Sequence, residues 1–146
     1  MSGPLTFGNA DPGILYVDRP AAYVVVIKDR RVAVVVPKER AFLPGGGMLA
    51  GEPAEETAVR ETLEELGLAV QLVAPIGQAV QYFYSPDDDI HYKMLATFFT
   101  GHFEGERSGT GENELRWLPR EKAEKACFHP CHAWAIRQCF SHDPQR

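Results

Sequence analysis

The sequence predicts an α/β fold of the mixed α+β kind, in which helices cover both faces of a mixed β-sheet. Short runs rich in β-branched residues lie on both sides of one strongly helical segment, and two further helical segments follow near the end of the chain. The first two runs are continuously apolar instead of alternating, as expected of strands that are covered on both faces. The 146 residues show no internal repeat and no linker, so we expect a single domain, 1–146.

The composition is that of an ordinary globular protein, with 45% hydrophobic and 24% charged residues. The formal net charge is −5 and no block of lysine or arginine is present, which argues against nucleic acid or an anionic membrane as a partner. A polyanionic substrate would therefore need bound cations to neutralise it. No apolar run can span a bilayer, no signal peptide is recognisable, and three clustered cysteines do not form a disulfide framework. We expect a cytoplasmic protein.

The N-terminal part of the chain is expected to form an irregular arm and then a hairpin. Residues 1–20 are rich in glycine and proline and predict the arm. Residues 23–27 and 31–36 predict two strands, and the turn-like residues 28–30 between them predict a hairpin. A last short strand is expected at 42–43, before a run of glycines.

The strongest helix signal follows these glycines. Pro53 suits the first turn of a helix, where its missing N–H costs nothing, and Gly67 suits the position just past the last turn. Glu55 and Glu56 lie near the positive end of the helix dipole. The remaining expected elements are extended chain over 70–84, a turn at 85–89, a strand over 91–103, a polar loop over 105–114, a strand over 115–118, and helices opened by Pro119 and Pro130.

Three carboxylates share one side of the central helix. On a wheel of about 100° per residue, Glu61, Glu64 and Glu65 fall within about 100° of one another. We expect the opposite side to dock on the sheet, and this apolar stripe consists of Val59, Leu63 and Leu66.

Like charges at this spacing repel by a few tenths of a kcal/mol per pair, which favours a compensating cation. Mg²⁺ and Mn²⁺ accept carboxylate and carbonyl oxygens, so Glu61, Glu64, Glu65 and the carbonyl of Gly46 are candidate ligands. The alternative is a solvated acidic face, with Arg60 reducing the repulsion.

The complete pattern of segment 46–68 decides between these interpretations. Gly46 is followed after five residues by Glu52, after seven more by Arg60-Glu61, after two more by Glu64-Glu65 and after one more by Gly67-Leu68. This segment resembles the Nudix box of the Nudix hydrolase family. One position departs, because the family usually has an aliphatic residue where this chain has Thr62, which we expect to affect packing and not metal ligation.

The resemblance implies an α/β/α sandwich with a central mixed sheet. It also implies hydrolysis of a pyrophosphate bond in a nucleoside diphosphate linked to another moiety X, through water activated by Mg²⁺ or Mn²⁺. Glu61 and Glu65 would be the main metal ligands, and Glu64 a further ligand or the catalytic base. Arg60 and Glu52 would form a structural salt bridge, and Gly45 and Gly46 would form the turn that binds the phosphates.

Other candidate residues lie outside the box. Nudix enzymes often recruit a further carboxylate from a distant loop, and Glu112 is preferred here over Glu114, although both also fit solvated loop acids. Aromatic and amide side chains on the extended segments would either line a substrate pocket or simply pack; these are Gln78, Gln81, Tyr82, Tyr84 and Tyr92, of which Tyr82 and Tyr84 are the preferred substrate-binding residues. Phe7, Tyr16 and Arg19 would cover a substrate or belong to a loose terminus.

Two other functions remain open at this point. One is a nucleotide-binding regulator that keeps the Nudix fold without turnover, although its box would be expected to be eroded. The other is an isomerase of isoprenoid diphosphates, which would need a cysteine–glutamate pair across the pocket, whereas the cysteines of this chain cluster near its C-terminus. The group X is undetermined, a small nucleotide-type substrate is expected, and a homodimer is left open.

Overall fold

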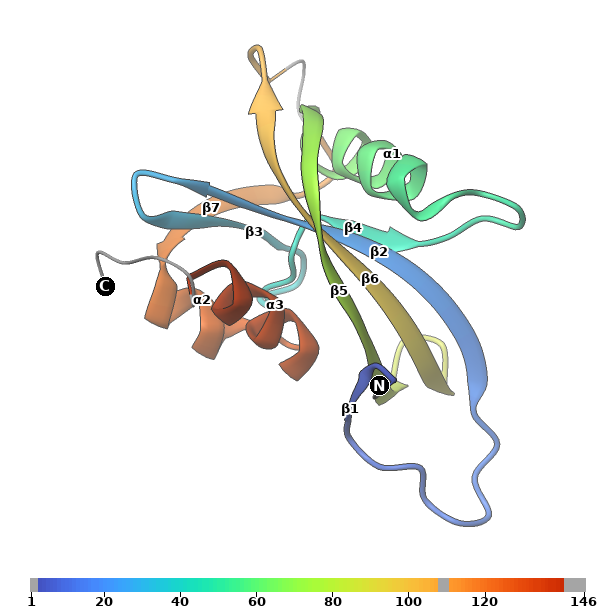
Figure 1. Cartoon of the computed structure of the whole chain (residues 1–146). Coiled ribbons are helices and arrows are strands. Elements are labelled where there is room, and N and C mark those ends of the chain that lie inside the picture. The colour runs from blue at the N-terminus through green and yellow to red at the C-terminus, as the bar shows by residue number, and fades with distance from the viewer. Residues whose placement is uncertain (1–2, 108–110, 141–146) are drawn as a thin grey trace.

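A computed structural model describes residues 3–107 and 111–140, so Ser108–Thr110 of the predicted polar loop lie outside the described residues. A mixed sheet lies between α1 on one face and α2 and α3 on the other (Figure 1), which confirms the predicted fold class. The elements are β1 (Leu5–Phe7), β2 (Val17–Lys28), β3 (Arg31–Val36), β4 (Gly45–Gly47), α1 (Ala54–Leu66), β5 (Ala69–Ser85), β6 (Ile90–Glu104), β7 (Glu114–Pro119), α2 (Arg120–Ala126) and α3 (Pro130–Phe140).

The sheet combines parallel and antiparallel pairs. Its strand order is β1-β5-β6-β2-β3-β7, and β4 pairs separately with β2. The pairs β1–β5 and β2–β6 are parallel, whereas the pairs formed by β2 with β3 and β4, β3 with β7, and β5 with β6 are antiparallel. The long β2 therefore contacts three other strands and forms the centre of the sheet.

The predicted N-terminal hairpin is confirmed. Lys28 of β2 pairs with Arg31 of β3, which leaves a two-residue turn. Both turn residues, Asp29 and Arg30, have positive φ values of 52° and 62°, as the tightest hairpin turns require.

Side chains of β2 point alternately into two cores. Tyr23 and Val25 belong to the larger core, which includes Ile136 of α3, whereas Ala22 packs with Ala58 of α1. Because both faces are covered, the whole run from Ala21 to Val26 is buried. Within the described part of the chain, no helix is long and apolar enough to cross a membrane.

The expected irregular arm over residues 1–20 is wrong in two places. Residues Leu5–Phe7 form β1 beside β5, with Leu5 opposite Ala79. Residues 17–20 already belong to β2, where Val17 pairs with Tyr92 of β6. Both pairings join segments that are far apart in the sequence, so the local richness in glycine and proline could not reveal them.

The expected docking face of α1 is also wrong. Val59 and Leu63 are 37% and 50% exposed, and of the predicted apolar stripe only Leu66 is buried. The buried face instead consists of Thr57, Ala58, Thr62 and Leu66. Small side chains on this face allow α1 to approach the sheet closely, which turns Glu61 and Glu65 toward β4 instead of toward solvent.

Candidate active site

The strand before α1 is made entirely of glycine. A Cβ at position 45 would lie 2.2 Å from the carbonyl oxygen of Ala22, and φ of Gly45 is +143°, so this position requires glycine. A Cβ at Gly46 would lie 2.2 Å from Oε2 of Glu61. The absence of side chains on β4 therefore leaves room for the carboxylates of α1 against the backbone of β4.

Arg60 and Glu52 brace the loop that joins β4 to α1. The guanidinium donates from Nε to Oε2 of Glu52 at 2.7 Å and from Nη2 to Oε1 at 3.0 Å. Its Nη2 also donates to the carbonyl of Gly47, and the hydroxyl of Thr57 donates to Glu52 at 2.6 Å. Arg60 first, and Thr57 next, lower the pKa of Glu52 to about 2. The bidentate pair fixes the loop geometry and is consistent with the proposed structural salt bridge.

Glu61 and Glu65 face β4 in a poorly solvated position. Oε1 of Glu65 accepts a hydrogen bond from the backbone N–H of Gly45 at 3.1 Å, and the side chain of Glu61 is 21% exposed. Burial raises the pKa of Glu65 to about 8, opposed by the Gly45 hydrogen bond and assisted by the charges of neighbouring acids. Burial also raises the pKa of Glu61 to about 7, with a further contribution from Glu64. Two adjacent carboxyls thus have a high affinity for positive charge near neutral pH.

Glu64 lies on the rim of this group. Both of its carboxylate oxygens accept hydrogen bonds from Nη1 of Arg60, at 3.1 and 3.2 Å, and its side chain is 46% exposed. Glu64 is close enough to Glu61 to raise the pKa of that carboxyl. Glu64 therefore neighbours the partly buried pair Glu61 and Glu65 and is itself exposed.

The loop that carries Glu112 is attached to the C-terminal end of α1. The N–H groups of Glu112 and Asn113 donate to the carbonyls of Glu64 and Glu65 at 3.2 and 2.9 Å. These bonds bring Glu112 close enough for its charge to raise the pKa of Glu65. The rival candidate Glu114 instead pairs with Arg116, which lowers its pKa.

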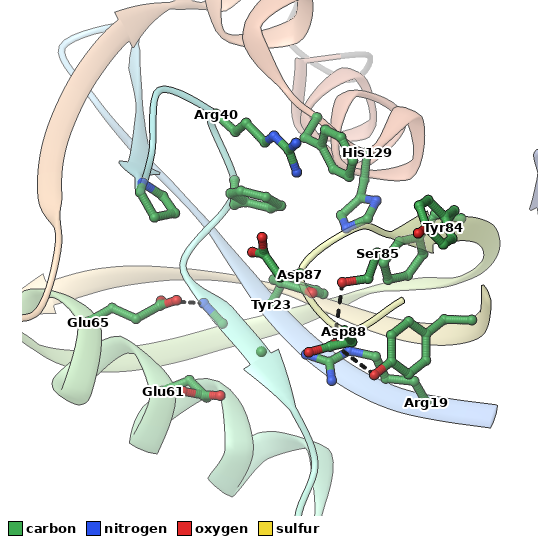
Figure 2. A pocket seen from close by; sticks show the side chains of 17 residues that line it. Arg19, Tyr23, Arg40, Glu61, Glu65, Tyr84, Ser85, Asp87, Asp88 and His129 are labelled. Atoms are coloured by element: carbon green, nitrogen blue, oxygen red, sulfur yellow. Dashed lines mark hydrogen bonds between the residues drawn. The ribbon is translucent and has the colours of Figure 1, made fainter. Parts of the chain in front are cut away.

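A cavity of about 300 Å³ opens beside Glu61 and Glu65 (Figure 2). Among the residues predicted for the site or as candidates for a substrate pocket, Gly45, Gly46, Glu61, Glu65, Tyr84 and Tyr92 line it. Glu64, Glu112 and Tyr82 are not among its lining residues; the ring of Tyr82 instead packs edge-on against Tyr16, with 5.1 Å between the ring centroids. The other lining residues are Arg19, Tyr23, Pro37, Arg40, Phe42, Phe83, Ser85, Asp87, Asp88, Phe128 and His129.

Most of this lining was not identified from the sequence. Arg19 was considered as a residue covering a substrate, and the structure places its guanidinium beside Gly47 and 5.5 Å from the ring centroid of Tyr92. Arg40 and the adjacent pair Phe128–His129 lie on two separate segments without a shared motif, so the sequence does not predict that they line one cavity. The predicted turn at 85–89 is confirmed, and its acids Asp87 and Asp88 also reach the cavity.

The residues at β4 fit a divalent cation. Among residues 3–107 and 111–140, no three His, Cys, Asp or Glu side chains form a group able to hold a metal ion alone. Glu61 and Glu65 nevertheless supply two oxygen donors with raised proton affinity, and the glycine backbone leaves space beside them. Mg²⁺ characteristically uses one or two carboxylates and completes its shell with water and substrate phosphates.

Comparisons with known proteins agree with this arrangement. The NUDIX domain model matches residues 17–139. A segment of 59 residues is 42% identical to a proposed 8-oxo-dGTP diphosphatase of Bacillus subtilis (strain 168), covering 38% of this chain and 40% of that protein. A segment of 80 residues is 31% identical to the proposed mutator protein MutT4 of Mycobacterium tuberculosis (strain CDC 1551 / Oshkosh), covering 53% and 32% respectively. The alignments thus span less than half the length of these relatives.

A solved structure shows the same fold. The NUDIX hydrolase from Nitrosomonas europaea superposes with a TM-score of 0.68 at 16% identity, over 86% of this chain and 90% of that chain. The domain match extends over most of the sequence and includes β2, the whole of segment 46–68 and the residues that line the cavity. The chain therefore belongs to the Nudix hydrolase family.

Proposed function

We propose that this protein hydrolyses a pyrophosphate bond in a nucleoside diphosphate linked to another moiety, using Mg²⁺ or Mn²⁺. One observation carries the proposal: two partly buried carboxyls with raised pKa values, Glu61 and Glu65, face a side-chain-free strand at the edge of a cavity. In this family such a box supports pyrophosphate hydrolysis. Because the protein has a net charge of −5, a negatively charged diphosphate would need a bound cation to neutralise it.

Each residue has a separate task in this proposal. Glu61 and Glu65 would hold the cation, with the backbone carbonyl of Gly46 as a further candidate ligand; a cation held there would supply neutralisation of the diphosphate charge and activation of the attacking water. The N–H of Gly45 fixes the carboxylate of Glu65. Arg19, which forms no ion pair among the described residues, supplies positive charge for the phosphates within the cavity.

Proton transfer is assigned to the more exposed acids. Glu64 neighbours Glu61 and is our first candidate for the base that accepts the proton of the attacking water. Glu112 is the second, because its loop is bonded to the end of α1. Gly45 and Gly46 would contact the phosphates, and Tyr84 the rest of the substrate. We propose a small-molecule substrate and a cytoplasmic location.

The two rival functions have less support. A regulator without turnover would not need the complete set of Glu61, Glu64 and Glu65 next to a braced loop. An isoprenoid diphosphate isomerase would need a cysteine in the cavity, but Cys127 and Cys131 lie outside its lining. Burial raises the pKa of both thiols to about 12, so neither is a reactive thiolate.

The test is a phosphate- and pyrophosphate-release screen with Mg²⁺ and with Mn²⁺. The panel contains nucleoside triphosphates, dinucleoside polyphosphates, ADP-ribose and UDP-sugars, and the name of the Bacillus subtilis relative makes triphosphates the first choice. Wild type is compared with Glu61→Gln, Glu65→Gln and the control Glu55→Gln, whose side chain is exposed on α1 away from the cavity.

We expect Glu61→Gln and Glu65→Gln to lower kcat/KM by roughly 100-fold or more, because each removes a charge that holds the cation. Glu55→Gln should match wild type. An inert wild type across the whole panel, or full activity in both site variants, would refute the proposal.

A further inference from the structure

His132 of α3 is a completely buried histidine that lies behind the wall of the cavity. It is 0% exposed and does not line the cavity itself. Its ring centroid lies 4.2 Å from that of Tyr23 and 5.1 Å from that of His129, and both of these residues do line the cavity. His132 can therefore influence the cavity only through the residues that it contacts.

The imidazole of His132 uses one nitrogen and leaves the other without a partner. Its Nδ1 accepts a hydrogen bond from the backbone N–H of Leu43 at 3.1 Å. Burial, and then the charge of His129, lower the pKa of His132 well below its usual value, so the ring is neutral near pH 7. Because an accepting Nδ1 carries no proton, the proton of the neutral ring lies on Nε2. This Nε2 has no hydrogen-bond partner among residues 3–107 and 111–140.

The unpartnered Nε2 indicates which atom of the ring is important. A buried donor without an acceptor is unfavourable, and a leucine or phenylalanine at this position would avoid that cost. Neither of these side chains could accept the N–H of Leu43. The bond to Leu43 is therefore the contribution that His132 makes and that an apolar side chain could not make.

Two side chains hold the segment that leads into β4, and they come from helices on opposite faces of the sheet (Figure 1). Leu43 donates its N–H to His132 of α3. Two residues later, Gly45 donates its N–H to Glu65 of α1 at 3.1 Å, as the dashed line in Figure 2 shows. Pro44 lies between these donors and has no N–H of its own. The bond to His132 thus holds the chain just before the N–H that contacts Glu65.

His132 also acts on Gly45 through the ring of Tyr23. Tyr23 of β2 pairs with Gly45 of β4, and a Cβ at Gly45 would lie 2.6 Å from Cδ1 of Tyr23. The same ring packs against the imidazole of His132, with an angle of 61° between the two ring planes. A change at His132 would therefore reach Gly45 by two routes, along the backbone from Leu43 and across the ring of Tyr23.

We propose that His132 is a positioning residue, which holds Leu43 and Tyr23 in place so that the N–H of Gly45 orients the carboxylate of Glu65. The inference rests on the proposed function, because it gives His132 a part in the reaction centre proposed at Glu65. Without the Nδ1 acceptor, the N–H of Leu43 would be left unpaired. We expect the chain before β4 to shift, the bond between Gly45 and Glu65 to loosen, and Glu65 to bind a divalent cation less tightly.

The bond itself is tested first in the wild-type protein, by NMR without substrate or divalent cation. We expect a scalar coupling through the hydrogen bond between the amide nitrogen of Leu43 and Nδ1 of His132, and a proton on Nε2 of the same ring. A missing coupling, or a proton on Nδ1, would overturn the inference. This measurement needs neither a variant nor turnover.

Variants of two residues of α3 then separate positioning from stability. His132→Leu removes the acceptor, whereas His132→Asn keeps one, because Oδ1 of asparagine occupies the same place along the side chain as Nδ1 of histidine. The controls are Ile136→Val and Ile136→Ala, because Ile136 is fully buried in the same core and its truncation lowers stability without removing a hydrogen bond. The measured quantities are the hydrogen-exchange rate of the Gly45 amide in metal-free protein and the Mn²⁺ affinity by calorimetry.

We expect His132→Leu to accelerate exchange at Gly45 about tenfold beyond an Ile136 variant of equal melting temperature, and to weaken Mn²⁺ binding about tenfold. His132→Asn should bring both quantities to within about twofold of wild type, because it restores the acceptor for Leu43. If both quantities follow melting temperature alone, or if His132→Asn behaves like His132→Leu, then His132 is only structural and the inference is wrong.

Circular dichroism establishes that each variant is folded, and His132→Phe replaces His132→Leu if the latter is not. If wild type hydrolyses no member of the substrate panel, the proposed function fails, and the exchange and Mn²⁺ measurements still decide the role of His132. If wild type is active and Glu65→Gln is not, but His132→Leu exchanges at Gly45 no faster than the Ile136 controls, only the positioning role is refuted.

Discussion

The backbone N–H of Gly45 donates a hydrogen bond to Oε1 of Glu65 at 3.1 Å and thereby ties β4 to α1. This bond favours the ionised form of Glu65, but burial outweighs it and raises the pKa of the carboxyl to about 8. Near neutral pH a proton is therefore held where we propose that a cation binds.

Stability of the cation-free protein should fall as the pH rises from about 6.5 to about 8.5. Glu61 and Glu65 have pKa values of about 7 and about 8 in the folded chain, above the ordinary value of 4.5. The folded state therefore binds more protons than the unfolded state, and this stabilisation is lost as each carboxyl ionises. The pKa of His129 is lowered from 6.5 to about 4, so its protonation alters the stability of the protein only below this pH window.

Thermal unfolding in a chelator across this pH window measures the effect. Glu65→Gln should reduce the slope of the melting temperature against pH, and a saturating divalent cation should abolish the slope or reverse it. An identical slope in wild type and Glu65→Gln would contradict the raised pKa of Glu65.

Alanine at two adjacent glycines should have different consequences. Gly46→Ala places a Cβ against the flexible carboxyl end of Glu61, so we expect a folded protein with weakened Mn²⁺ binding. Gly45→Ala places its Cβ against the main chain of Ala22 and Tyr23 at a positive φ, so we expect poor folding.

Circular dichroism and calorimetric Mn²⁺ titration distinguish the two variants. The steric account fails if Gly46→Ala binds Mn²⁺ as tightly as wild type, or if Gly45→Ala melts at the wild-type temperature.

Two buried threonines of α1 should respond oppositely to valine. Thr62 is fully buried, and its hydroxyl has no hydrogen-bond partner among the described residues, so Thr62→Val should raise the free energy of unfolding by about 1 kcal/mol. Thr57 is equally buried, but its hydroxyl donates to Glu52 and to the carbonyl of Pro53, so Thr57→Val should lower that free energy by about 1–3 kcal/mol. Urea denaturation measures both changes, and effects of the same sign would contradict this account.

Arg107 should stabilise the end of α1 and position Glu112. Its guanidinium donates to the carbonyls of Leu66 and Asn113, beside the backbone bonds that hold Glu112. We expect Arg107→Ala to lower the free energy of unfolding by roughly 1–2 kcal/mol. The control Arg116→Ala, which removes only an exposed local pair with Glu114, should change it by less than about 0.5 kcal/mol.

A double-mutant cycle separates the positioning role of Arg107 from its effect on stability. If Arg107 acts on turnover through Glu112, then Arg107→Ala combined with Glu112→Gln should lower kcat no further than Glu112→Gln alone. Additive losses in kcat would show that Arg107 does not act through Glu112.

Local signals in the sequence were sufficient to predict the loop and the bounds of α1. Gly67 adopts the left-handed conformation with φ of 66°, and its N–H bonds to the carbonyl of Leu63, as expected for a glycine that ends a helix. The hairpin of β2 and β3 was predictable for the same reason, because its pattern and its turn are contiguous. By contrast, β4 has no side chains and therefore no pattern, and it becomes a strand only by pairing with β2.

The orientation of α1 and the cavity lining depend on tertiary contacts. The apolar pattern of the helix predicts that Val59 and Leu63 face the sheet. In the structure α1 instead packs on the sheet through the smaller side chains of Ala58 and Thr62. The cavity joins residues as distant as Arg19 and His129, which no local period connects. These features follow from the packing of whole elements and cannot be derived from a local stretch of sequence.

The most direct test of the proposed reaction centre is hydrolysis of the best substrate in ¹⁸O-labelled water with Mg²⁺, followed by mass spectrometry of both products. We predict that wild type incorporates one labelled oxygen into one of the two products, and that Glu65→Gln forms almost no labelled product in the same time. Equal label incorporation by wild type and Glu65→Gln would contradict the assignment of Glu65, and with it the central claim that Glu61 and Glu65 beside β4 form the reaction centre.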